Sequence, residues 1–189
     1  MALTVPSPRA PFEGDAAQWY RSELGWAATD GSPVQLTTGV HFDVLDVPAE
    51  AGAAVLSRVA RTGPVALTGR RMQLLVAAGS AEELPGLLDW LEWGGVELDL
   101  TATGAGGRVT APPPPGCAGA LEAAVWLRPP VPGREAELPA LTGLGDSGSA
   151  PDLARLVDTA ATESHRIRLL HTARRRNARR TETQPLAFS

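Results

Sequence analysis

The pattern of hydrophobic and polar residues predicts strands and helices that alternate along the first 130 residues. Apolar and β-branched residues dominate 41–47 (HFDVLDV) and 71–77 (RMQLLVA), which are therefore predicted as strands. Shorter strands are expected at 34–37, 64–67, 96–100, 108–111 and 124–127. Helical spacing and end signals predict helices over 13–24, 49–61 and 80–93. This order predicts an α+β fold, with a mostly antiparallel or mixed sheet and flanking helices.

A longer helix is predicted near the C-terminus, and its apolar residues are expected to dock on the body. Ser149 is followed by Asp152 three residues later, which is typical of a helix start. The apolar stripe comprises Leu153, Leu156, Val157, Ala160, Ser164, Ile167 and Leu170. The chain is thus divided into an irregular lead-in (1–12), one domain (13–130), a Pro/Gly/Ser-rich linker (131–148), a C-terminal helix (149–176) and a flexible tail (177–189).

Composition excludes several classes of protein. The chain has 189 residues with 43% hydrophobic residues, which is above the range of disordered chains. Its single cysteine, Cys117, excludes an internal disulfide and a cysteine-rich zinc site. It has no lysine, which removes Schiff-base and phosphate-loop lysines from consideration. Without an apolar run long enough for a signal or a membrane span, we expect a cytoplasmic protein that does not enter a membrane.

Charge is distributed unevenly along the chain. Residues 1–165 carry ten arginines and twenty acids, whereas residues 166–189 carry seven arginines and one acid. An acidic body with a basic end predicts contact between that end and an anionic partner such as DNA. The alternative is a solvated helix end, because arginines there also interact favourably with the helix dipole. The nucleic-acid-binding candidates are Arg166, Arg168, Arg174, Arg175, Arg176, Arg179 and Arg180.

Two carboxylates lie in apolar segments that are predicted as strands. Asp46 ends HFDVLDV and Asp99 lies within VELDL. A buried carboxylate is costly unless it is paired, and two strands that each supply one can hold a divalent metal. The alternative is that each accepts hydrogen bonds from the backbone or from arginine. Asp43 is three residues from Asp46, so the two should point to opposite faces of the sheet.

A glycine-rich segment at 104–107 (GAGG) precedes Arg108. Such a loop can approach a phosphate closely, but it is also typical of a simple turn between strands. The segment lacks the strand–loop–helix context of a dinucleotide-binding motif.

Three segments together resemble a known family: TTGVHFDVLDVPAEAG (37–52), GPVALTGRRMQLLV (63–76) and GVELDLTATGAGGRVTAPP (95–113). With the Trp-Tyr and Gly-Trp pairs near residue 20, they resemble the N-terminal domain of bifunctional DNA primase/polymerases. This is the primase–polymerase (Prim-Pol) branch of the archaeo-eukaryotic primase superfamily, here in a divergent actinobacterial form. The resemblance covers about 60% of the chain, from residue 19 to about 130, and implies a primase–polymerase-like mixed sheet with flanking helices.

The resemblance also implies a set of site residues. In the family, an Asp-x-Asp strand, a later His and a further Asp hold two metals and the nucleotide phosphates. Here Asp46 and Asp99 occupy two of the Asp positions, Val44 or Pro48 replaces the third, and Gln73 replaces the His. The implied catalytic and metal-binding residues are therefore Asp46 and Asp99. The implied nucleotide-binding residues are Gln73, Arg71 and Arg108.

Three functions follow as hypotheses. The first is a catalytically degenerate Prim-Pol-like domain that binds nucleic acid or nucleotide, because two of four expected groups are lost. The second is a protein-interaction module that acts through the C-terminal helix and the arginine-rich tail. The third is an active primase/polymerase with a reduced metal site, which would require Mg²⁺ or Mn²⁺ as its cofactor. The sequence favours a protein without catalysis.

Overall fold

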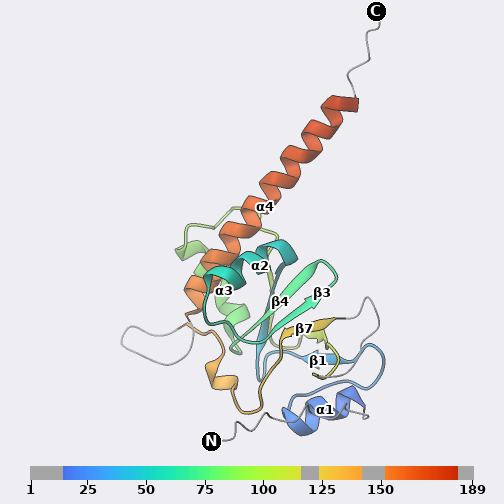
Figure 1. Ribbon diagram of the computed structural model, residues 1–189. Helices are drawn as coiled ribbons and strands as arrows, with labels where there is room; N and C mark the ends of the chain where they lie inside the picture. The colour runs from blue at the N-terminus through green and yellow to red at the C-terminus, as the bar shows by residue number, and fades with distance from the viewer. Residues whose placement is uncertain (1–14, 116–123, 142–151, 183–189) are drawn as a thin grey trace, which may run out of the picture.

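The computed structural model describes residues 15–115, 124–141 and 152–182 and shows an α+β fold (Figure 1). Its helices are α1 (Ala16–Glu23), α2 (Ala49–Arg58), α3 (Ser80–Trp90), the short 3-10 helix η1 (Glu135–Glu137) and α4 (Leu153–Glu182). Its strands are β1 (Gln35–Thr37), β2 (Asp43–Pro48), β3 (Val65–Thr68), β4 (Arg71–Val76), β5 (Thr101–Thr103), β6 (Arg108–Thr110) and β7 (Val125–Arg128). The strands form one sheet in the order β5-β2-β4-β3-β7 and a second sheet of β1 and β6.

The central pair of strands, β2 and β4, gives the main sheet two different faces. Leu45 and Val47 point to one face of β2, and Val44 and Asp46 point to the other, because side chains alternate along a strand. Leu45 lies opposite Leu74 of β4 in the antiparallel ladder, so apolar residues meet apolar residues on the first face. The predicted strands at 41–47 and 71–77 are confirmed in position.

Three helices cover the first face of the main sheet. Side chains of α2, α3 and α4 pack on Leu45, Val47 and Leu74 in one core. The predicted burial of Leu156, Val157 and Ile167 is confirmed, with exposed fractions of 1%, 1% and 8%. Leu170, expected to continue the stripe, is 49% exposed. The C-terminal part of α4 extends beyond the body (Figure 1).

The second face of the sheet is covered at one end only. There Tyr20 of α1 and Trp26, which lies between α1 and β1, pack with Phe42, Val44 and Leu75. Leu36 of β1 belongs to the same cluster. The Tyr20 hydroxyl donates to the Pro112 carbonyl at 2.7 Å and accepts from Trp126 Nε1 at 2.8 Å. The other end of this face, which carries Asp46, remains partly exposed.

Two predictions about the strands were wrong. Residues 96–100 are not a strand, and the strand that pairs with β2 begins only at Thr101. β5 and β6 do not form a hairpin around the glycine segment, because β5 pairs with β2 and β6 pairs with β1. All ladders between the described strands are antiparallel, which agrees with the mostly antiparallel alternative of the prediction; the mixed sheet that the family resemblance implies is not observed among them.

Helix boundaries and the linker also differ from expectation. α3 begins at Ser80 as predicted, with Gly79 (φ of 93°) as its N-cap, but it ends at Trp90 and not at residue 93. Asp152 Oδ1 accepts from the Ala154 amide at 2.9 Å and caps α4, which runs past residue 176 to Glu182. The described part of the expected linker packs on the body, as the burial of Leu138 shows. Residues 1–12, 142–148, 149–151 and 183–189 lie outside the described residues.

Candidate functional site

The register of β2 and β4 brings three of the predicted site residues together. Asp46 lies directly opposite Gln73, so both side chains lie on the second face of the sheet. Asp46 also pairs with Thr101 of β5, and Asp99 lies two residues before that strand. Asp46 and Gln73 thus share a sheet face, as expected. Asp99 is adjacent to them but precedes the strand on which it was expected.

Arg71 joins the two carboxylates of this site. Its Nε donates to Asp46 Oδ1, its Nη2 donates to the Asp46 carbonyl at 3.1 Å, and its Nη1 donates to Asp99 Oδ1 at 2.5 Å. Arg71 reaches both because it lies two residues before Gln73, on the same face of β4. The arginine therefore occupies the position between Asp46 and Asp99.

The environment of Arg71 keeps it fully charged. Partial burial by itself lowers the pKa of Arg71, but hydrogen bonds and Coulombic attraction from Asp99 and Asp46 outweigh it. The pKa is therefore raised above its ordinary value. The Asp46 side chain is 19% exposed and the Asp99 side chain is 57% exposed, so the Asp46 contact is the less screened of the two.

These residues do not fit the two-metal site that the family resemblance implies. The two carboxylates that the resemblance assigns to this site, Asp46 and Asp99, are both bound to Arg71. Arg71 is bound to Oδ1 of each carboxylate, so a divalent ion between the two Asp residues would meet the charge of the guanidinium at close range, and this repulsion opposes its binding. Within residues 15–115, 124–141 and 152–182, no group of three or more His, Cys, Asp or Glu is placed to hold a metal. The metal role of Asp46 and Asp99 remains a prediction.

Asp43 serves the fold on the opposite face of the sheet. Its side chain is completely buried, and Oδ2 accepts from the Ala81 amide at the start of α3 at 2.9 Å. A carboxylate at a helix N-terminus satisfies a free backbone amide and interacts favourably with the dipole. The predicted separation of Asp43 and Asp46 onto different faces is thus confirmed.

Arg108 lies on β6, in the small sheet, and not in the same sheet as Asp46. The glycine segment before it folds back on itself, with the Gly107 amide donating to the Gly104 carbonyl at 2.9 Å. The Ala105 amide donates to Glu82 Oε1 at 3.4 Å. A carboxylate therefore already faces this turn, which argues against a phosphate there. The expected nucleotide-binding set is split, with Gln73 and Arg71 together and Arg108 elsewhere.

A large groove of about 1030 Å³ opens beside Arg71. One wall is α4, and the others are the start of α2, the β3–β4 turn and the segment before β5. Its basic lining residues are Arg70, Arg71, Arg168, His171 and Arg175. The sequence did not reveal this groove, because residues more than 100 positions apart form it.

The predicted nucleic-acid-binding arginines divide into two groups. Arg166 forms an ion pair with Glu163 at 3.7 Å, and Arg168 donates to the carboxylate and the carbonyl of Glu97. Arg168 thus joins α4 to the segment before β5, whereas the ion pair of Arg166 lies within α4. The remaining candidates lie on the part of the helix beyond residue 171, and those whose side chains are described are exposed: Arg174, Arg175 and Arg176. Arg179 and Arg180 lie on the last turns of α4.

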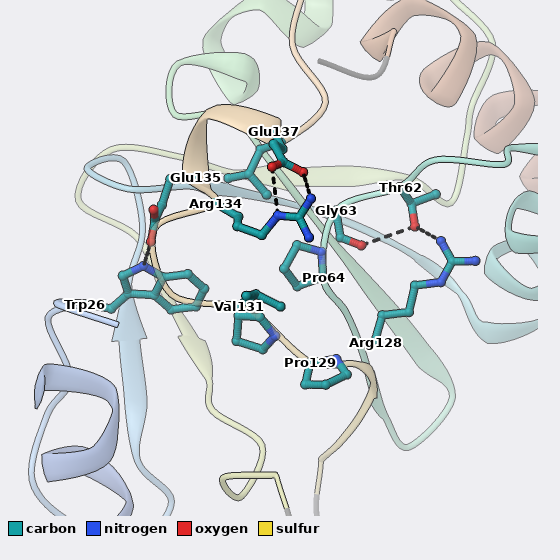
Figure 2. Close-up of a pocket in the computed structure, with 12 residues that line it drawn as sticks. Trp26, Thr62, Gly63, Pro64, Arg128, Pro129, Val131, Arg134, Glu135 and Glu137 are labelled. Atoms are coloured by element: carbon teal, nitrogen blue, oxygen red, sulfur yellow. Dashed lines mark hydrogen bonds and ion pairs between the residues drawn. The ribbon is translucent and has the colours of Figure 1, made fainter. Parts of the chain in front are cut away.

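A second, smaller cavity of about 220 Å³ lies where the end of β7 and the segment after it meet η1 and the segment before β3 (Figure 2). Trp26 lines it and donates from Nε1 to Glu135 Oε1 at 3.2 Å. The Arg128 guanidinium donates to Thr62 Oγ1 at 2.6 Å, and Arg134 is paired with Glu137. Its charged groups are thus largely satisfied by one another. Sequence reasoning missed it, because half of its lining comes from residues assigned to the linker or to its boundary.

Comparison with protein-family models, with curated proteins and with solved structures gives no match to this chain. None of the described helices is long and apolar enough to cross a membrane. Functional argument therefore rests on the geometry of the site and on the basic residues of α4.

Proposed function

We propose that this chain is a Prim-Pol-like domain of the cytoplasm that binds nucleic acid and does not transfer nucleotides. The observation that carries the binding part is the exposure of Arg174, Arg175 and Arg176 on the end of α4 that extends beyond the body (Figure 1). No ion pair involves these three side chains within the described part of the chain. They are therefore available to phosphates, whose charge-assisted contacts with guanidinium are strong.

The absence of catalysis is supported by the contacts of Arg71. Nucleotidyl transfer with metals needs carboxylates that bind the ions and so neutralise charge on the reacting oxygens. Asp46 and Asp99 instead neutralise a guanidinium. Gln73, opposite Asp46, can donate a hydrogen bond to a phosphate but carries no positive charge.

The test of binding is the salt dependence of DNA affinity. Each phosphate neutralised on duplex DNA contributes about 0.9 to the slope of log K against log salt. The triple variant Arg174→Gln, Arg175→Gln and Arg176→Gln should therefore reduce the slope by about 2.7, measured by fluorescence anisotropy with a short duplex.

The matched control removes the same charge elsewhere. Arg21, Arg61 and Arg155 are also exposed, so replacing all three by Gln changes the net charge by the same amount. This control should keep the slope of the unmodified protein. Equal losses in the two triple variants would show that binding reflects net charge alone. Absence of binding to both duplex and single-stranded DNA at low salt would overturn the proposal.

A second candidate function, a protein-interaction module, is favoured by two leucines on α4. Leu169 and Leu170 are 57% and 49% exposed, on the same helix as the arginines. Exposed apolar side chains next to basic ones are typical of a helix that docks on a partner. Loss of partner capture on Leu169→Ser and Leu170→Ser, with DNA affinity absent throughout, would favour this function over the first.

A further inference from the structure

The inner face of α4 changes from apolar to basic where the helix leaves the body. Leu156, Ala160 and Ser164 are buried along this face. At the same helical spacing, the face continues with residues that line the large groove: Ile167, Arg168, His171, Thr172 and Arg175. Arg174 and Arg176 do not line the groove, since each is turned by about 100° from Arg175 around the helix axis. The groove therefore has a defined basic wall.

Each acidic side chain that lines the groove faces a basic residue, and two arginines of the lining are left without an acidic partner among the described residues. Glu97 binds Arg168, Asp99 binds Arg71, and Glu50 Oε2 lies 3.8 Å from His171 Nε2. Arg70, on the β3–β4 turn, and Arg175, on α4, form no ion pair with any described residue. Two guanidinium groups on opposite walls are thus left for a ligand with negative charge.

A buried hydroxyl provides an independent indication of a ligand. Ser164 is among the residues that line the groove, is fully buried, and its Oγ has no hydrogen-bond partner among the described residues. Buried polar atoms are normally paired, so an unpaired one beside a cavity calls for an acceptor or donor from outside. A hydroxyl can donate to an anionic oxygen at this position.

We propose that this groove binds the backbone phosphates of a single-stranded nucleic acid, with Arg70 and Arg175 as the main phosphate contacts. This inference rests on the proposed nucleic-acid binding and assigns the bound form and its path. A groove with walls on both sides admits one flexible strand, whereas a duplex is a stiff rod that presents both strands on its outside. The groove is continuous with the exposed basic end of α4 through Arg175.

The experiment compares two pairs of arginines on a single-stranded and a duplex probe. Arg70→Gln with Arg175→Gln removes the groove contacts, and Arg174→Gln with Arg176→Gln removes the same charge off the groove face. On a labelled oligothymidylate, the groove pair should reduce the salt slope by about 1.4, since each phosphate on a single strand contributes about 0.7. The off-face pair should lose less than half of that. Circular dichroism checks that both variants remain folded.

The charge reversal Arg70→Glu sharpens the test, because Arg70 lies across the groove from α4. It should weaken oligothymidylate binding more than duplex binding. If Arg70→Glu binds both probes as the unmodified protein does, or if the two arginine pairs lose equal slope, the groove inference is wrong while nucleic-acid binding stands. If the unmodified protein binds neither probe, the proposed function itself fails.

Discussion

The ion pairs of Arg71 predict a measurable coupling between this arginine and Asp46. Arg71→Gln removes the charge but keeps a polar side chain of intermediate length. Asp46→Asn and Asp99→Asn remove each carboxylate charge in turn. Double-mutant cycles with these variants isolate the two interactions, because effects on the rest of the protein cancel within each cycle.

The expected magnitudes follow from exposure. The Arg71 and Asp46 side chains are 33% and 19% exposed. Exposed ion pairs contribute about 0.2–1 kcal/mol, and hydrogen bonds to charged groups contribute about 1.5–3 kcal/mol. The contact of Arg71 with Asp46 is intermediate in exposure, so we expect a coupling free energy of about 1–2 kcal/mol. Asp99 is 57% exposed, and its coupling to Arg71 should fall in the exposed range of about 0.2–1 kcal/mol.

Urea unfolding of the four proteins in each cycle gives these couplings from changes in the free energy of unfolding. The exposed pair Arg21 and Asp30, with side chains 44% and 82% exposed, serves as the matched control and should show a smaller coupling than Arg71 with Asp46. Raising the salt to about 1 M should weaken the control most, because the Debye length falls to about 3 Å.

Two results would refute the reasoning about Arg71. A coupling between Arg71 and Asp46 within about 0.3 kcal/mol of zero would show that the guanidinium does not hold this carboxylate. A rise in the unfolding midpoint on adding Mn²⁺, abolished by Asp46→Asn, would show that a metal displaces Arg71 from the position between the two carboxylates. The metal site that the family resemblance implies would then be restored.

Three further predictions concern the core and the absence of catalysis. Leu156→Ala should reduce the free energy of unfolding by about 2–4 kcal/mol, because Leu156 is 1% exposed and its removal leaves a cavity; an unchanged melting temperature would show that α4 is free. Tyr20→Phe should cost about 1–3 kcal/mol, since Trp126 Nε1 and the Pro112 carbonyl lose their buried partner. Burial raises the pKa of Tyr20 above its ordinary value of about 10. Its contribution to stability is therefore fully present below about pH 10 and lost as the pH rises further, which unfolding against pH measures; the Phe variant should lack this loss. Primer extension with Mg²⁺ or Mn²⁺ should yield no product, and template-dependent product that disappears in Asp46→Ala would contradict this.

The local sequence pattern was sufficient to predict the strands and helices that bury an apolar face in the core. The apolar and β-branched residues of 41–47 and 71–77 predict β2 and β4, and helical spacing from Leu153 to Ile167 predicts the docked part of α4. These predictions hold because burying one face of an element requires apolar residues at its own period, whatever the partner. The opposite faces of Asp43 and Asp46 follow from the same period.

Pairing between distant segments was decided only by the tertiary structure. VELDL alternates as a strand does, yet the edge of β2 is taken by residues 101–103, and a strand forms only where a partner supplies hydrogen bonds. The contact of Arg71 with Asp46 and Asp99 depends on the register of β4 against β2, in which Pro48 lies opposite Arg71. The basic groove likewise exists only because α4 lies over the first face of the sheet. Such contacts depend on which surfaces meet in space, and this is set by the packing of the whole core and not by any local period.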